Sequence, residues 1–306
     1  MEEENLKKEI SLIKKEINLL KTLLVGVVAF VLISEIFGIP YLSGWQSSVN
    51  HEKSYEDLEA LVIPKNGYNI PIKWRDLGKK MVEAGVIDKD KFESIYAGKG
   101  RLSDLEKELL YGSNNEKIHI DLNNSGTILN LLWAFGLSNK TDILEMGPMV
   151  SEQFGGDPSR FASTGGWTLS SGNSMDHYSK HEFVSLNDEQ KQLVKDITMK
   201  IYRPCCNNST FFPDCNHGMA MLGLVQLLAS ENLSESEIME VSLKVNSYWF
   251  PDQYLTIAKY LDNQDKSWKK TSAEEILGAD YSSATGFGRI KNQVNPGGSN
   301  SSSCSV

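Results

Sequence analysis

The stretch PCCNNSTFFPDCNHG, residues 204–218, holds three of the four cysteines of this 306-residue chain and one of its five histidines. Cys205, Cys206, Cys215 and His217 form the pattern Cys-Cys-x8-Cys-x-His. Three thiols and one imidazole equal the four ligands of a tetrahedral zinc ion, and the same thiolates suit Cu(I). The pattern therefore predicts a site that binds zinc or copper.

The spacing of these ligands differs from that of common structural zinc sites, in which about two to four residues separate paired ligands. Because adjacent cysteines ordinarily point in different directions, we expect either three protein ligands with an open position or completion by another segment. His177 and His181 could complete the site from one face of a helix, and Asp176 could orient one of their rings. Catalysis would require the open coordination position.

Two other interpretations of the thiols remain open. A disulfide between Cys206 and Cys215, or a vicinal bridge between Cys205 and Cys206, would make this a thiol–disulfide protein or a stapled scaffold without catalysis. Cys215 falls at the expected start of a helix, where the positive dipole end stabilises a thiolate. The third interpretation is ordinary structural thiols, although the polar loop between the cysteines disfavours a core position.

Predicted helices on both sides must position the cluster. Residues 188–202 carry an apolar stripe after a cap at Asn187, and Pro204 prevents the helix from continuing. Asp214 is expected to cap the next segment, which is apolar on nearly every side and should therefore be buried. Residues 126–137, GTILNLLWAFGL, have the same character and predict a buried central helix.

The rest of the domain also reads as helical. Expected helix starts are Asp88, Asn124, Ser103 with Glu106, Ser234 and Pro251. We predict an all-α domain over residues 55–279 with a long Gly/Ser-rich loop at 154–181, and at most a short hairpin between 167–169 and 182–184. The Gly- and Ser-rich residues 280–306, which include Cys304, predict a disordered tail.

Residues 1–21 predict a charged amphipathic helix on the cytoplasmic side. Apolar residues recur at alternating steps of four and three from Leu6 to Leu24, as in a coiled-coil seam. Residues 6–24 therefore predict either a homo-oligomer through a short zipper or a solvated helix beside a membrane.

Residues 22–42 predict a transmembrane helix, since about 20 largely apolar residues suffice to cross a lipid bilayer. Glu35 weakens this prediction, and a cleaved signal peptide is the competing interpretation. Five lysines precede the span, whereas only Lys53 lies in the 20 residues after Pro40. The positive-inside rule then predicts a single-pass signal-anchor protein of the cell membrane, with a cytoplasmic N-terminus, a linker at 43–54 and an extracytoplasmic main domain.

Composition narrows the function classes further. The chain is long enough to bury a large core, so it does not need cysteine staples for stability. The formal net charge of -9 would repel phosphate backbones, and the basic cluster lies at the N-terminus. We therefore predict no nucleic-acid partner.

Overall fold

The computed structural model describes residues 14–18, 20–22, 56–98, 100, 102–113 and 117–294. The chain divides into two units, Met1–Asp57 and Leu58–Val306. In the first unit, residues 14–18 and 20–22 are helical. The described helices include none with the length and apolar character needed to cross a membrane. The predicted anchor at 22–42 lies outside the described residues except for Thr22, and the linker at 43–54 lies wholly outside them.

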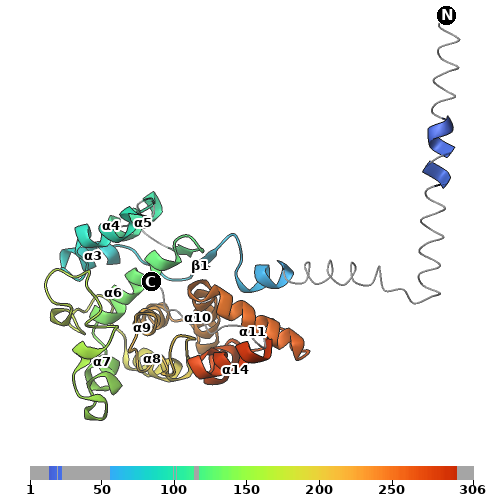
Figure 1. The fold of residues 1–306 in the computed structure, drawn as a ribbon. Helices are drawn as coiled ribbons and strands as arrows, with labels where there is room; N and C mark the ends of the chain where they lie inside the picture. Colours follow the sequence, from blue (N-terminus) through green and yellow to red (C-terminus); the bar gives the residue numbers. More distant parts are fainter. Residues whose placement is uncertain are drawn as a thin grey trace, which may run out of the picture. The chain divides into compact units, whose positions relative to one another are not determined.

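The second unit is mainly helical, as the sequence predicts (Figure 1). Residues 56–62 are helical. The first half then contains β1 (Tyr68–Ile70), α3 (Leu77–Glu83), α4 (Lys89–Ala97), α5 (Asp104–Tyr111), β2 (Ile118–Ile120), α6 (Ser125–Ser138) and α7 (Asp142–Met146). After a long loop come α8 (Asp188–Lys200), α9 (Asn216–Ser230), α10 (Glu235–Trp249), α11 (Pro251–Asn263), α12 (Ala273–Leu277), α13 (Ala279–Ser282) and α14 (Ala284–Val294).

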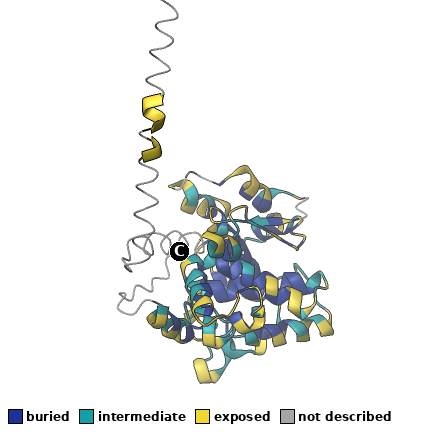
Figure 2. Ribbon diagram, turned by 90° about the vertical axis from the view of Figure 1, so that its right-hand side faces the viewer, coloured by how far each residue is buried: buried dark blue, intermediate teal, exposed yellow. Residues whose placement is uncertain are grey.

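The core forms around α6 and α9, which are apolar on almost every side and buried along most of their length (Figure 2). Their backbones touch where Gly136 faces Gly223, because a Cβ on Gly136 would collide with the carbonyl of Met219. At this crossing Asn139 donates to the side chain of Gln226 (3.0 Å). α8 and α10 pack against α9, and α14 packs against α11. These contacts hold the N-terminus of α9 in the interior.

Local signals place most helix starts correctly. Asp88 caps α4, and full capping boxes begin α5 at Ser103, α8 at Asn187 and α10 at Ser234. Asn124 precedes α6 as predicted, but its amide donates to the carbonyl of His119 (2.8 Å) and does not cap the helix. Pro251 occupies the first turn of α11, where it loses no helical hydrogen bond.

The Gly/Ser-rich loop between α7 and α8 is irregular, as expected, and contains single 3-10 turns. These are η1 (Pro148–Val150), η2 (Glu152–Phe154), η3 (Pro158–Arg160) and η4 (Ser174–Asp176). The short hairpin was predicted at the wrong place. The antiparallel pair is β1 with β2, in which Ile70 faces Ile118. Residues 167–169 form no strand because Trp167 is buried against Trp133 as a core residue.

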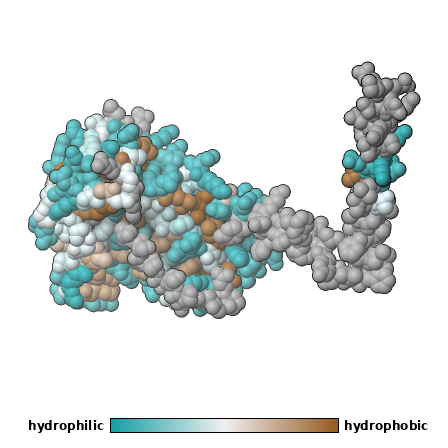
Figure 3. Space-filling view, turned by 45° about the horizontal axis from the view of Figure 1, so that its top comes forward, coloured by the Kyte–Doolittle hydropathy of each residue, from teal (hydrophilic) through white to brown (hydrophobic). Residues whose placement is uncertain are grey.

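The C-terminal boundary at residue 279 was also wrong. Residues 279–294 form α13 and α14, and Ile290 is buried. Glycine content obscured an apolar stripe at Phe287, Ile290 and Val294 that packs against the core. Residues 295–306, including Cys304, lie outside the described residues. On the face seen in Figure 3, the surface of the second unit is largely hydrophilic, with small separate apolar patches.

Candidate metal centre

The three thiols predicted to cooperate meet at one point. The Sγ atoms of Cys205 and Cys206 lie 3.2 Å apart, those of Cys206 and Cys215 also 3.2 Å, and those of Cys205 and Cys215 3.7 Å. The ligand atoms of Cys205, Cys215 and His217 all lie within 4.8 Å of one another. The four residues of the pattern therefore lie close enough to hold a metal ion.

These distances come near to those of an occupied site. Zinc–sulfur bonds of about 2.3 Å in a tetrahedron place sulfur atoms about 3.8 Å apart. The longest of the three separations, 3.7 Å, already agrees with this value. The other two, at 3.2 Å, need to lengthen by only about 0.6 Å to reach it.

Both adjacent cysteines point into the cluster, contrary to the expectation from their spacing. A tight turn makes this possible, in which the N–H of Cys206 donates to the carbonyl of Arg203 (3.2 Å). The described part of the turn has no cis peptide bond and no left-handed residue. The loop is tied back to α8, because the N–H of Thr210 donates to the carbonyl of Ile201 (2.8 Å).

The start of α9 delivers the third thiol. Cys215 is the N-cap residue, and its Sγ accepts the N–H of Gly218 (3.4 Å). Asp214, the predicted cap, accepts instead from the side chains of Arg203 (2.6 Å) and Asn208 (2.7 Å). A sulfur at the positive end of a helix is stabilised in its thiolate form.

A buried guanidinium supports the thiols. Arg203 is 1% exposed, and its Nε–H donates to Cys215 Sγ (3.1 Å). Its other nitrogens donate to the carbonyls of Asn208 (2.8 Å) and Phe212 (3.3 Å) and to the carboxylate of Asp214. The guanidinium nitrogens thus hold different parts of the loop between α8 and α9. Arg203 acts as the internal brace of the cluster.

Gly218 makes room for that brace. A Cβ at this position would lie 2.6 Å from the Cζ of Arg203 and 2.6 Å from one of its terminal nitrogens. Since such contacts do not occur between non-bonded atoms, any side chain here must displace the guanidinium. Glycine is therefore required by close approach in the first turn of α9.

The charge of the thiol cluster is concentrated on one sulfur. Hydrogen bonds from Cys205 and Cys206 hold the pKa of Cys215 well below its usual value, and Arg203 lowers it further. Hydrogen bonds with Cys206 and Cys215, together with burial, raise the pKa of Cys205. The cluster without metal thus favours a thiolate at Cys215, paired with the arginine, and protonated thiols at Cys205 and Cys206, whose pKa values are both raised. Metal binding would release the remaining thiol protons.

His217 is prepared as a neutral donor. Its side chain is buried, which lowers its pKa to about 4. The Oδ1 of Asn216 accepts both the backbone N–H of His217 (2.9 Å) and its Nδ1 (2.9 Å). An amide oxygen can only accept, so Nδ1 carries the proton and Nε2 keeps its lone pair. Such fixing of the far nitrogen is typical of metal-binding histidines.

His177 and His181 meet each other. His177 Nδ1 lies 3.1 Å from His181 Nε2. The groups of three or more potential ligands within 4.8 Å of one another, in the described part of the chain, contain neither histidine. They do not share a helix, because η4 ends at Asp176 and Ser179 has a left-handed φ of 52°. Their part as ligands of the thiol site stays a prediction.

Two supporting residues were not identified from the sequence. Arg203 stands two positions before Cys205, and Asn216 stands between two candidate ligands. The signal that could have revealed Arg203 is Gly218, since a glycine in the first turn of an apolar helix indicates close approach of another group. Asn216 gives no signal of its own, because its role depends on the helix start.

The last helix contacts the cysteine turn. The N–H of Ala284 donates to the carbonyl of Cys206 (2.9 Å). Both the N–H and the hydroxyl of Thr285 donate to Oδ1 of Asn207 (2.9 Å each). The start of α14 therefore buttresses the same turn that presents the adjacent thiols.

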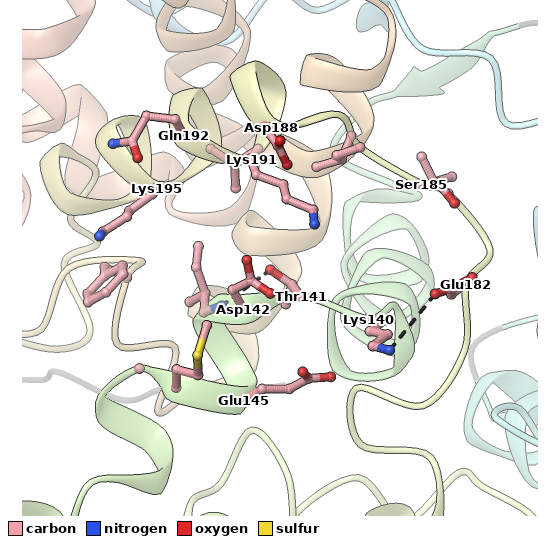
Figure 4. A pocket seen from close by; sticks show the side chains of 17 residues that line it. Lys140, Thr141, Asp142, Glu145, Glu182, Ser185, Asp188, Lys191, Gln192 and Lys195 are labelled. Atoms are coloured by element: carbon pink, nitrogen blue, oxygen red, sulfur yellow. Dashed lines mark hydrogen bonds and ion pairs between the residues drawn. The ribbon is translucent and has the colours of Figure 1, made fainter.

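A pocket of 770 Å³ lies elsewhere, between α7 and α8 (Figure 4). Its lining carries both signs of charge, and Lys140 and Glu182 pair across one side at 3.9 Å. The other charged groups are Asp142, Glu145, Asp188, Lys191 and Lys195. The pocket shares no lining residue with the thiol cluster. We do not assign it to the metal centre.

Comparison of this chain with protein-family models, with curated proteins and with solved structures yields no match. The interpretation of the site therefore rests on its own geometry. That geometry is a half-buried cluster of three thiols beside one buried, neutral imidazole, held by a buried arginine, in a mainly helical domain.

Proposed function

We propose that this chain binds one zinc ion through Cys205, Cys206, Cys215 and His217. The observation that supports this most strongly is the meeting of three sulfur atoms within 3.7 Å of one another. Free thiols have no reason to crowd in a polar loop, whereas a soft ion binds them all. The fixed Nδ1 proton of His217 leaves Nε2 to supply the fourth bond.

Charge favours zinc over copper. Three thiolates with Zn²⁺ leave one negative charge beside the ion pair that the buried Arg203 forms with Asp214. With Cu(I) two negative charges would remain in the same interior, at a higher desolvation cost. A closed set of four protein ligands is typical of structural zinc, so the ion would join the end of α8 to the start of α9. Cu(I) is the alternative occupant.

The proposed setting is the outer face of a cell membrane. Residues 22–42 would anchor the chain in the lipid bilayer, and the lysines before them would keep the N-terminus in the cytoplasm. Residues 6–24 would allow pairing with a second copy. Protease protection in sealed vesicles tests this orientation. Digestion of the second unit only from the cytoplasmic side would refute an extracytoplasmic main domain.

Elemental analysis tests the metal site directly. The full chain, purified without chelator or a metal affinity resin, should contain one zinc per chain. Cys206→Ser should lose it, and Cys304→Ser, which changes the cysteine outside the pattern, should keep it. Wild-type protein that stays metal-free after incubation with Zn²⁺ under reducing conditions would refute the proposal.

A second candidate function is thiol–disulfide chemistry. The 3.2 Å separation between Cys206 and Cys215 supports it, because a small movement would allow a bond between them. Thiol titration of the denatured protein with and without prior reduction distinguishes the two. A gain of two thiols on reduction, without metal, favours the disulfide. An equal count in both excludes it, and the metal content then separates zinc from free structural thiols.

A further inference from the structure

His177 and His181 form a second place where two nitrogen ligands face each other. Their facing nitrogens, Nδ1 and Nε2, lie 3.1 Å apart. Imidazole–metal bonds are about 2.0–2.1 Å long. An ion bound to both nitrogens at this separation would make a nitrogen–metal–nitrogen angle of roughly 100°. This lies between the values for square-planar and tetrahedral coordination. The rings lie end to end, with centroids 5.4 Å apart and planes at 22°, so each has to turn by roughly 40° to direct its lone pair at the ion.

The hydrogen bonds around the pair direct one lone pair into the gap. His177 Nε2 lies 3.3 Å from the carbonyl oxygen of Ser171. Because a carbonyl can only accept, Nε2 carries the proton of this ring and Nδ1 presents its lone pair to His181. In the empty pair, His181 therefore donates its Nε2 proton to that lone pair. A carbonyl behind a histidine is a common support of metal ligands.

Backbone hydrogen bonds fix the segment that carries the two rings to the end of α6. The N–H of Ser179 donates to the carbonyl of Leu137 (2.9 Å), and that of His181 donates to the carbonyl of Ser138 (2.9 Å). Ser179 occupies the left-handed region, which is unfavourable for a residue with a side chain. The negative end of the α6 dipole lies here, and it favours a cation.

The pair is separate from the thiol cluster. Residue Asn139, which bridges to His181, donates to Gln226 of α9 (3.0 Å). Gln226 follows Cys215 by eleven positions, a rise of about 16 Å along a helix. An ion held by the histidines would therefore be a different ion from the one at the thiols.

We infer that His177 and His181 bind a second metal ion, a borderline divalent cation of the zinc, nickel or copper class, with water in its remaining positions. Imidazole nitrogen suits these ions. No net proton is released from the neutral pair. The Nε2 proton of His181 moves through solvent to its Nδ1, which makes no hydrogen bond within the described residues, and the freed lone pair binds the ion. The inference does not depend on zinc at the thiols.

The test is the number of zinc ions bound by the full chain in equilibrium dialysis against excess Zn²⁺ under reducing conditions. Wild type should hold two ions. His181→Phe, which keeps an aromatic ring beside Phe183, should hold one, and so should Cys206→Ser. His119→Gln, a change at a half-buried histidine on β2 that belongs to neither site, should still hold two. Unfolding curves check that each variant is folded, and His177→Gln replaces His181→Phe should the latter not fold.

The outcomes separate the two sites. Equal zinc in wild type and in a folded His181→Phe variant would overturn the second site. If wild type binds one ion and Cys206→Ser binds none, zinc binds only at the thiols, and this result also overturns the inference. If wild type binds one ion and His181→Phe binds none, the result supports the histidine site and refutes zinc binding at the thiols. Loss of an ion in His119→Gln would show that the count includes surface binding, and overturns the assignment.

Discussion

Gly218→Ala should destabilise the domain even though alanine is the better helix former. At an open helical position this change stabilises by about 0.5–1 kcal/mol. At Gly218 the new Cβ would lie 2.6 Å from a guanidinium that is 1% exposed and hydrogen-bonded on all sides. Overpacking of this kind costs about 1–3 kcal/mol. The net expectation is a loss of about 1–2 kcal/mol, with Arg203 pushed away from Cys215.

Gly126→Ala is the matched control. Gly126 also lies in the first turn of a buried helix, but a Cβ there would meet nothing within 4 Å. Urea unfolding of both variants gives the two free energies, and thermal unfolding should differ by about 2–4 °C per kcal/mol for a domain of this size. Zinc retention should fall in Gly218→Ala alone. Equal stability and equal zinc in the two variants would refute the view that Arg203 is locked in place.

Three further changes have definite expected results. Gly223→Ala should cost more than Gly218→Ala, because its Cβ would meet the backbone of α6, and urea unfolding measures the difference. Asn139→Ala should lower the free energy of unfolding by about 1–3 kcal/mol, since it leaves Gln226 buried without its partner. Ser234→Ala removes the α10 capping box and should cost about 1 kcal/mol; an unchanged urea midpoint would contradict the role of this cap.

Local features of the sequence predicted much of the fold. Capping residues such as Ser103 and Asn187 are recognised from their neighbours within one helical turn, so they can be read without knowledge of the tertiary structure. The two fully apolar segments predicted buried helices, and they are α6 and α9. The predicted C-terminal end of the domain was wrong, because the glycines in residues 284–294 obscured an apolar stripe. That stripe is recognised only from its packing against α11.

The candidate site was predicted by residue type but not by geometry. Ligand number and softness identified the four residues, and these properties need no coordinates. Spacing alone suggested that Cys205 and Cys206 would diverge, whereas the turn after Arg203 brings both inward. The role of Arg203 was missed because its partners lie up to fifteen positions away: Gly218 indicates that some group approaches closely, but the sequence does not say which one. Likewise, the two loop histidines could have shared a face only if a helix had formed there, and they instead contact each other across a left-handed serine.

The contact between Ala284 and the carbonyl of Cys206 has a practical consequence for anyone who trims this protein. A C-terminal truncation at residue 279, where composition suggests the domain should stop, would delete the helix that supports the cysteine turn. Such a fragment would have lost a structural support of its thiols while retaining every one of the four ligands. A chain that ends, or is cut by a protease, between α13 and α14 therefore weakens the thiol site without removing any of its ligands. A fragment made to study the site needs to extend through Val294.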